Sequence, residues 1–148
     1  VAQYCPTATP LPINCPAGTY NPVTGRGDLS WCLTCPAGYY CDESTLRHSF
    51  HFKMDTDLLA SLCTGSSNLT GLCSPGYYCP AGSTTPTASP CPPGTYNGFS
   101  GGQSDAACAV CPSGTYCPNS ATVTPTPCTQ GYYCRTRSTQ VEPCPLGT

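Results

Sequence analysis

The heptapeptide Cys35-Pro-Ala-Gly-Tyr-Tyr-Cys41 decides how this chain folds, because close copies of it follow one another along the sequence. The pattern Cys-x-x-Gly-[Tyr/Thr]-Tyr-Cys opens at Cys35, Cys73, Cys111 and Cys128. A longer form reads CPAGTYN from Cys15 and CPPGTYN from Cys91. All ten tyrosines lie in these units or in the clipped unit that ends at Cys5. Self-similarity of this kind is typical of repeat proteins, so the sequence predicts a series of small units.

A larger repeat contains the small ones. The cysteine steps of 17, 3 and 6 residues that follow Cys15 recur after Cys91, at an offset of 76 residues. The sequence therefore divides into the tail of a preceding repeat (1–14), a repeat at 15–90 with an insertion at 42–72, a second repeat at 91–143, and the start of a further repeat at 144–148. Because the units at both ends look clipped, we expect the chain to be a window of a longer array.

The composition explains why the units are small. Of 148 residues, 15 are cysteine, a density that marks a disulfide scaffold. Leu, Ile, Val and Phe make up roughly an eighth of the chain, too little for an apolar core of ordinary size. Disulfides must replace that core, and they persist only in oxidising compartments. We therefore expect an extracellular or cell-surface protein.

Charge and hydropathy exclude several classes of partner. The net charge of −2 offers no basic surface for nucleic acid or anionic lipid. No apolar run approaches the ~20 residues that a membrane-spanning helix needs. We predict no nucleic-acid partner and no membrane-spanning segment.

Homologous spacing favours two disulfides, Cys15–Cys32 and Cys91–Cys108. An interleaved pair, Cys111–Cys128 with Cys117–Cys134, is a further candidate arrangement. Since 15 is odd, at least one cysteine is free or bonded to a cysteine outside these 148 residues. Candidates for that role are Cys63, Cys144 and Cys5. The alternative is that Cys5 or Cys144 pairs locally and that Cys63 finds a partner.

One glycine recurs three residues after each opening cysteine. It stands at Gly18, Gly38, Gly76, Gly94, Gly114 and Gly131. A turn with positive φ, or close approach of the backbone to a disulfide, would explain it. The Thr/Ser/Pro-rich joints at 7–12, 83–90, 120–127 and 138–143 predict extended, polyproline-like segments without helix.

The insertion differs from the rest of the chain. Residues 49–52 alternate as a short strand would, and residues 54–62 fit two helical turns capped by Asp55 or Asp57. This segment is where a binding site would lie. The more conservative interpretation is a local plug over a joint between units.

Candidate chemistry is sparse. The Cys-x-x-Cys spacings at 32–35 and 108–111 suit zinc or redox sites, but zinc needs reduced thiols, so structural disulfides are favoured. Arg26-Gly27-Asp28 matches the integrin-binding tripeptide and equally suits an ordinary turn. We nominate no catalytic residue, metal ligand or cofactor, and predict that the chain is not an enzyme.

Covalent glycans are predicted at two kinds of site. Asn68-Leu69-Thr70 is an N-glycosylation sequon, with Asn68 as the acceptor. Hydroxyls beside proline are candidate O-glycosylation sites, namely Thr9, Thr85, Ser89 and Thr124. A bare polar linker is the alternative for these four.

The pattern C-P-x-G-T-Y-N…C-x-x-C-P-x-G-[YT]-Y-C resembles the ephrin-receptor-like cysteine-rich repeats over residues 1–41 and 73–148. Arrays of such repeats occur in protist and algal surface proteins, including mastigoneme proteins of flagellar hairs. The resemblance implies a small disulfide-rich fold, in which tandem repeats of short β-hairpins and loops form an elongated rod with little helix. It implies a structural glycoprotein of an extracellular filament at a surface such as that of a flagellum, whose partners are copies of itself or neighbouring repeats. The alternative is a receptor or adhesion ectodomain that binds a protein ligand through residues 42–72.

Overall fold

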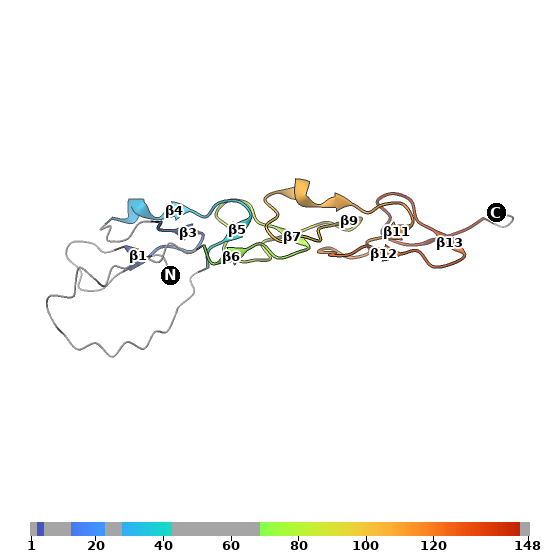
Figure 1. Cartoon of the computed structure of the whole chain (residues 1–148), viewed down its shortest axis with the longest axis horizontal. Coiled ribbons are helices and arrows are strands. Elements are labelled where there is room, and N and C mark those ends of the chain that lie inside the picture. Colours follow the sequence, from blue (N-terminus) through green and yellow to red (C-terminus); the bar gives the residue numbers. More distant parts are fainter. Residues whose placement is uncertain (1–2, 5–12, 23–27, 43–68, 146–148) are drawn as a thin grey trace, which may run out of the picture.

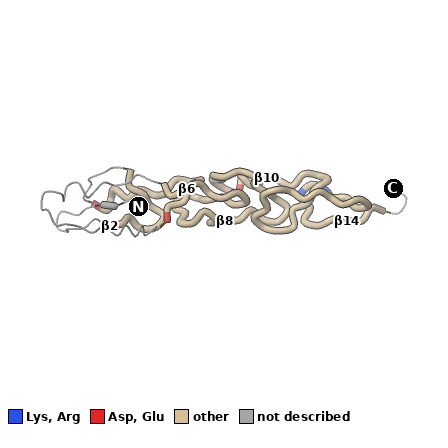
Figure 2. Tube along the Cα trace, turned by 60° about the horizontal axis from the view of Figure 1, so that its bottom comes forward, with Lys and Arg blue, Asp and Glu red and all other residues tan. Residues whose placement is uncertain are grey.

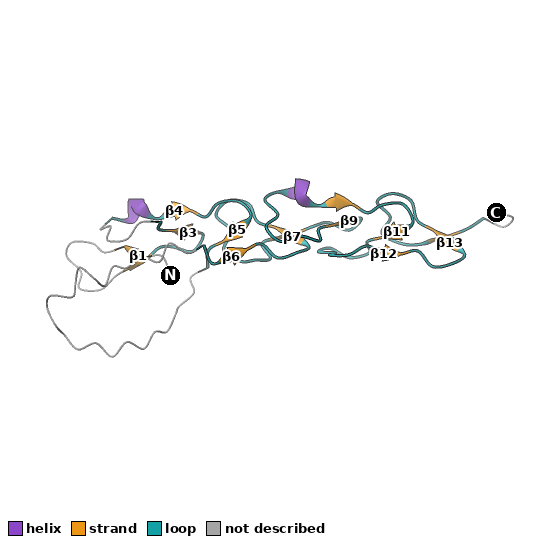
Figure 3. Cartoon of the chain, in the orientation of Figure 1, coloured by secondary structure: helices purple, strands orange, loops and turns teal. Residues whose placement is uncertain are grey.

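The computed structural model describes residues 3–4, 13–22, 28–42 and 69–145. They form an elongated rod in which one short hairpin follows another from the N-terminal to the C-terminal end (Figure 1). Most of the rod is loop and turn, interrupted by very short strands (Figure 3). The predicted fold class, a small disulfide-rich chain of hairpin repeats, is confirmed.

Seven antiparallel ladders of two strands each make up the described hairpins. Each strand has only two residues, because the next turn or cysteine follows at once. The pairs are β1 (Gln3–Tyr4) with β2 (Ile13–Asn14), β3 (Thr19–Tyr20) with β4 (Leu33–Thr34), β5 (Tyr39–Tyr40) with β6 (Gly71–Leu72), β7 (Tyr77–Tyr78) with β8 (Ser89–Pro90), β9 (Thr95–Tyr96) with β10 (Ala109–Val110), β11 (Thr115–Tyr116) with β12 (Thr126–Pro127), and β13 (Tyr132–Tyr133) with β14 (Glu142–Pro143). Two single-turn 3-10 helices, η1 (Leu29–Trp31) and η2 (Asp105–Ala107), lie in the two long units.

The Thr/Pro-rich joints do more than link the units. Their last two residues are the returning strands β8, β12 and β14, which pair with the Thr-Tyr or Tyr-Tyr strand of the preceding unit. Proline is tolerated there because each ladder has only two strands, so a residue without an N–H can face outward. The predicted extended backbone is correct for these residues, and their role as strands was not foreseen.

Cysteine forms the interior of the rod. Nine cysteines are buried, and the other buried side chains in the described ranges are polar: Asn21, Ser83, Thr95 and Asn97. The tyrosines from Tyr20 onward are half-buried except for exposed Tyr132, and large aliphatic side chains such as Leu33 and Leu72 are exposed. Sulfur therefore takes the place of an apolar core, as the composition predicted.

The insertion leaves and rejoins the rod at one place. Thr70 donates its backbone N–H to the carbonyl of Tyr40 (3.1 Å), and its hydroxyl donates to the Asp42 carboxylate (2.9 Å). The Asp42 N–H in turn donates to the Thr70 hydroxyl (3.1 Å). The strand and helix predicted at 49–52 and 54–62 lie outside the described residues.

Candidate functional site: the contacts between successive repeats

Six disulfides lie in the described residues. Two of them, Cys15–Cys32 and Cys91–Cys108, span 17 residues and are the pairs that homologous spacing favoured. The other four span six residues, and each joins the first and last cysteine of one Cys-x-x-Gly-x-Tyr-Cys unit: Cys35–Cys41, Cys73–Cys79, Cys111–Cys117 and Cys128–Cys134. All four cysteines of the two Cys-x-x-Cys spacings are therefore in disulfides.

The interleaved pairing of Cys111 with Cys128 and of Cys117 with Cys134 is wrong. The turn at Pro112–Gly114 reverses the chain, so that the Cα atoms of Cys111 and Cys117 lie 6.2 Å apart, within reach of a disulfide. Cys128 and Cys134 are brought to the same distance by the turn at their own glycine. Each short unit is thus closed on itself, and no described disulfide links one short unit to another.

Four features recur in the units. We call the first cysteine of a unit the opening cysteine, the residue six positions later the closing residue, and the turn between them the first turn. Units are named by their opening cysteine, from the Cys15 unit to the Cys128 unit. A second turn follows the closing residue, and one of its residues has positive φ: Gly82, Gly101, Ala121 or Arg137 in the units where it is described.

In the two long units the closing residue is asparagine. Asn21 is fully buried and Asn97 nearly so. The Asn97 side chain donates from Nδ2 to the carbonyl of Tyr77 (3.0 Å), in the preceding unit, and accepts from the N–H of Phe99 (3.1 Å). A buried side chain with two hydrogen bonds therefore holds the place that a disulfide sulfur takes in the short units (Asn97 against Cys79). The shared motif letters GTYN were the only sequence signal, and the role of the asparagine was missed.

The first-turn glycines all have positive φ, between 79° and 87°, as predicted. Their neighbour is not a disulfide. A Cβ on Gly38 would lie 2.8 Å from the carbonyl oxygen of Gly101, and one on Gly94 would lie 2.7 Å from that of Arg137. Gly18 faces Gly82 and Gly76 faces Ala121 in the same way. Backbone conformation and close approach of a second chain segment therefore both demand glycine at these four positions.

Adjacent units are joined by a repeated pair of main-chain hydrogen bonds. The first-turn glycine donates its N–H to the carbonyl of the next unit's closing residue, as Gly94 does to Cys117 (2.9 Å). The next opening cysteine donates back to the glycine carbonyl, as Cys111 does to Gly94 (3.0 Å). The same two bonds recur from the Cys15 unit to the Cys111 unit. Each unit is thus held in a constant register on the next.

The second turn reaches back over two units. In the Cys128 unit, Arg137 donates its N–H to the carbonyl of Cys111 (2.7 Å), and the carbonyl of Ser138 accepts from the N–H of Cys117 (2.9 Å). The Arg137 carbonyl packs on Gly94, one unit further back. The second turns at Gly82, Gly101 and Ala121 make the corresponding contacts. Nearly all of these contacts use main-chain atoms, so they suit any repeat that has the same backbone.

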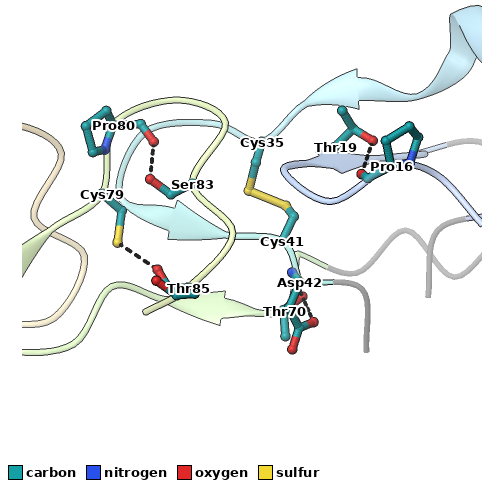
Figure 4. Close-up of a disulfide and its surroundings, with 10 residues drawn as sticks. All are labelled: Pro16, Thr19, Cys35, Cys41, Asp42, Thr70, Cys79, Pro80, Ser83 and Thr85. Atoms are coloured by element: carbon teal, nitrogen blue, oxygen red, sulfur yellow. Dashed lines mark hydrogen bonds between the residues drawn. A yellow bond between two sulfur atoms is a disulfide. The ribbon is translucent and has the colours of Figure 1, made fainter. Parts of the chain in front are cut away.

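Figure 4 shows one such joint around the Cys35–Cys41 disulfide. The Thr19 hydroxyl donates to the Pro16 carbonyl, and the Ser83 hydroxyl donates to the Pro80 carbonyl, both at 2.6 Å. These bonds brace the first and second turn respectively.

The candidate O-glycosylation sites that the structure describes are other hydroxyls than these. Thr85 and Thr124 are exposed, and Ser89 is half-buried in β8. Thr9 and Asn68 lie outside the described residues. The hydroxyl of Thr70, in the Asn68 sequon, is hydrogen-bonded to Asp42.

The remaining predictions concern the unpaired cysteines, the Arg-Gly-Asp tripeptide and metal binding. Cys144 is a free, exposed thiol, whereas Cys5 and Cys63 lie outside the described residues. Asp28 caps η1 by accepting the N–H of Ser30 (2.8 Å), which fits the turn interpretation of the tripeptide; Arg26 and Gly27 are not described. In the described ranges, no three His, Cys, Asp or Glu side chains gather as a metal site requires.

Charge plays a small part along the rod. Charged residues are few and scattered along the described part of the chain (Figure 2). Arg135 lies 5.5 Å over the ring of Tyr133, donates to its hydroxyl (3.2 Å) and pairs with Glu142 at 3.9 Å. The hydrogen bond to Tyr133, followed by the nearby Glu142, raises the pKa of Arg135. This cluster joins the two strands of the last hairpin.

No known family model matches the chain. A curated protein that resembles it is ABC transporter G family member 28 of Arabidopsis thaliana, with 28% identity over 134 residues. The alignment covers 74% of this chain and 12% of that protein. None of the helices in the described ranges has the length and apolarity needed to cross a bilayer. The number of disulfides indicates a secreted or extracellular protein.

Proposed function

We propose that this chain is a structural segment of an extracellular glycoprotein filament, such as a flagellar hair, built from repeats like those of the ephrin-receptor-like family. The observation that carries the proposal is the constant joint between units. Each short unit is closed by its own disulfide, and each unit from the Cys15 unit to the Cys111 unit is fastened to the next by the same main-chain hydrogen bonds. A rod of this kind can be extended by adding units, without a growing apolar core.

The exposed surface also supports a structural role. Exposed Thr85 and Thr124 lie in proline-rich segments and could carry covalent glycans along the rod. Electron microscopy of material purified from the source should show long, regular fibres that react with an antibody against this chain. Dispersed single particles alone would count against the proposal.

A receptor or adhesion ectodomain is the second candidate, because the insertion is closed at its base. Asp42 and Thr70 meet there, so residues 43–69 could be displayed without altering the rod. The alignment to a small part of a much longer protein fits a module within a larger molecule.

The test of this second candidate replaces residues 43–69 with a short Gly/Ser linker. A receptor would lose capture of its protein ligand while the six disulfides of the rod stay intact. An unchanged set of captured proteins would favour the structural role.

A further inference from the structure

Two second turns present the same arrangement of hydroxyl groups. Counted from the residue with positive φ, which is Gly82 in one turn and Ala121 in the other, the third, fourth and fifth positions read Thr-Pro-Thr. These positions are 85–87 and 124–126, and in both the two threonines are exposed while the proline between them is half-buried. We call Thr85 with Thr87, and Thr124 with Thr126, the threonine doublets.

The hydroxyl at the first position after the positive-φ residue is used differently. Ser83 donates its hydroxyl to the carbonyl of Pro80 (2.6 Å), and Thr122 donates to that of Asn119 (2.7 Å). Ser83 is buried and Thr122 is half-buried. The hydroxyls of the doublets have no hydrogen-bond partner among the residues that the structure describes. Each turn therefore keeps one hydroxyl bonded to its own main chain and presents two to solvent.

The fold also holds the doublets in place. The carbonyl of Pro86 accepts the N–H of Ser74 (2.8 Å), so the centre of the first doublet is fastened to the body of its unit. Thr126 is the first residue of β12 and pairs with Tyr116. A transferase can reach these exposed hydroxyls without local unfolding, whereas the hydroxyl of Ser83 would first have to leave its carbonyl and be uncovered.

The surface around the doublets carries almost no charge. Asp105 is the only charged residue from 69 to 134. Apolar side chains nevertheless face solvent in this part of the rod, such as Phe99, which is 82% exposed, and Val123, which is 43% exposed. A folded chain without surface charge tends to associate and precipitate. Sugars hydrate a protein surface without adding charge, so they would supply the hydration that charged side chains provide elsewhere.

We propose that both members of each doublet are acceptors of O-linked sugars, so that the rod carries glycans in adjacent pairs. Thr87 and Thr126 thereby join the two threonines that were predicted from the sequence, and Ser83 and Thr122 are excluded. Proline beside a hydroxyl residue is typical of O-glycosylated segments. In each transfer the Oγ1 atom of threonine forms a bond to the anomeric carbon of a monosaccharide. The bond from that carbon to a nucleoside diphosphate breaks, the nucleoside diphosphate leaves with the electron pair, and the hydroxyl proton passes to a base of the transferase.

This inference rests on the extracellular glycoprotein role proposed above, but the two fail separately. Regular fibres whose threonines are bare would refute the glycan doublets and leave the filament role standing. Glycosylated rods that remain single particles would do the reverse.

The direct test maps the sugars on the chain purified from its source. Peptides are fragmented by electron transfer, which leaves sugars attached to their side chains. Sugars should be found on all four doublet threonines and on neither Ser83 nor Thr122. Sugars on Thr85 and Thr124 with bare Thr87 and Thr126 would overturn the pairing. Four bare threonines would overturn the proposal, and so would sugars on Ser83 or Thr122 as often as on the doublets.

A matched pair of variants, secreted by cells of the source organism, tests the choice of hydroxyl. Thr126→Val and Thr122→Val each replace one hydroxyl by a methyl group. Thr126→Val should lose the sugar of one acceptor in the intact mass, with the six described disulfides retained, and Thr126→Ser should keep that sugar. Thr122→Val should keep the full glycan mass. An unchanged glycan mass in Thr126→Val would contradict the proposal. If Thr122→Val is not secreted, the sugar map of the unaltered chain still decides whether Thr122 is an acceptor.

Discussion

Replacement of Asn97 by aspartate is the sharpest test of how the long units are held. The Asn97 side chain is 4% exposed, and its Nδ2 donates to the Tyr77 carbonyl at 3.0 Å. Asn97→Asp keeps the shape of the side chain and the oxygen that accepts from Phe99. It exchanges the donor for a carboxylate oxygen that faces a carbonyl. Buried charge without a positive partner is the main consequence, because no Lys or Arg is described beside it.

Two contributions make up the loss of folding free energy that Asn97→Asp should cause. The lost hydrogen bond contributes about 1 kcal/mol, and a buried carboxylate left without a partner raises the total to roughly 3–5 kcal/mol. Asn119→Asp is the matched control, because the Asn119 side chain is exposed in the second turn of the Cys111 unit. It should cost close to nothing.

The destabilisation caused by Asn97→Asp should depend on pH. In the folded chain only the protonated carboxyl can donate to Tyr77, and burial disfavours the charged form, so the pKa of the introduced carboxyl is raised above its unfolded value of about 3.9. Below the unfolded pKa, the carboxyl is protonated in both the folded and the unfolded chain, and most of the loss of stability disappears. As pH rises through the unfolded and then the folded pKa, the destabilisation grows to its full size.

Local hydrogen exchange is the suitable assay, because a repeat array need not unfold in one step. The Gly76 N–H donates to the Asn97 carbonyl (2.7 Å) and the Asn97 N–H to Thr122 (3.0 Å), so both amides report on this joint. At pH 7 their exchange should accelerate by at least about a hundredfold relative to the original chain, since 3 kcal/mol corresponds to roughly that factor. Equal exchange in Asn97→Asp and Asn119→Asp at pH 7 would refute the argument, and so would a loss that persists unchanged at pH 3.

Three further outcomes are expected. Gly76→Ala should destabilise its joint by roughly 1–3 kcal/mol more than Gly131→Ala, because both share the strain of positive φ but only Gly76 faces a carbonyl, that of Ala121; equal losses measured by exchange at the two joints would contradict this. Peptide mapping without reduction should recover every short bridge within its own unit, and a peptide that joins two short units would be evidence against the arrangement. Asp42→Ala removes the acceptor of the Thr70 hydroxyl and should accelerate exchange of the Thr70 amide about fivefold, for a loss of about 1 kcal/mol, whereas an unchanged rate would show that the base of the insertion is held otherwise.

The local chemistry of each unit could be predicted from the sequence. A glycine three residues after a cysteine predicted a turn with positive φ, and the six first-turn glycines all have it. The 17-residue spacing shared by Cys15 and Cys91 pointed to their partners, because the same loop occurs twice. The scarcity of aliphatic residues predicted an interior of cysteine, and the buried cysteines confirm it. These features depend on residues that are close in sequence or on composition alone.

Only the tertiary structure decided how the units meet. The second-turn residues Gly82, Gly101, Ala121 and Arg137 share no side chain, because they contact earlier units through main-chain N–H and carbonyl groups that every residue has. The choice between the bridge Cys111–Cys117 and an interleaved pair was equally invisible, since both fit the spacing until the turn at Gly114 sets the distance. The role of Asn97 could not be predicted either, because an asparagine at this position gives no signal of burial in the sequence. Its buried position against Tyr77 appears only when two units are placed side by side.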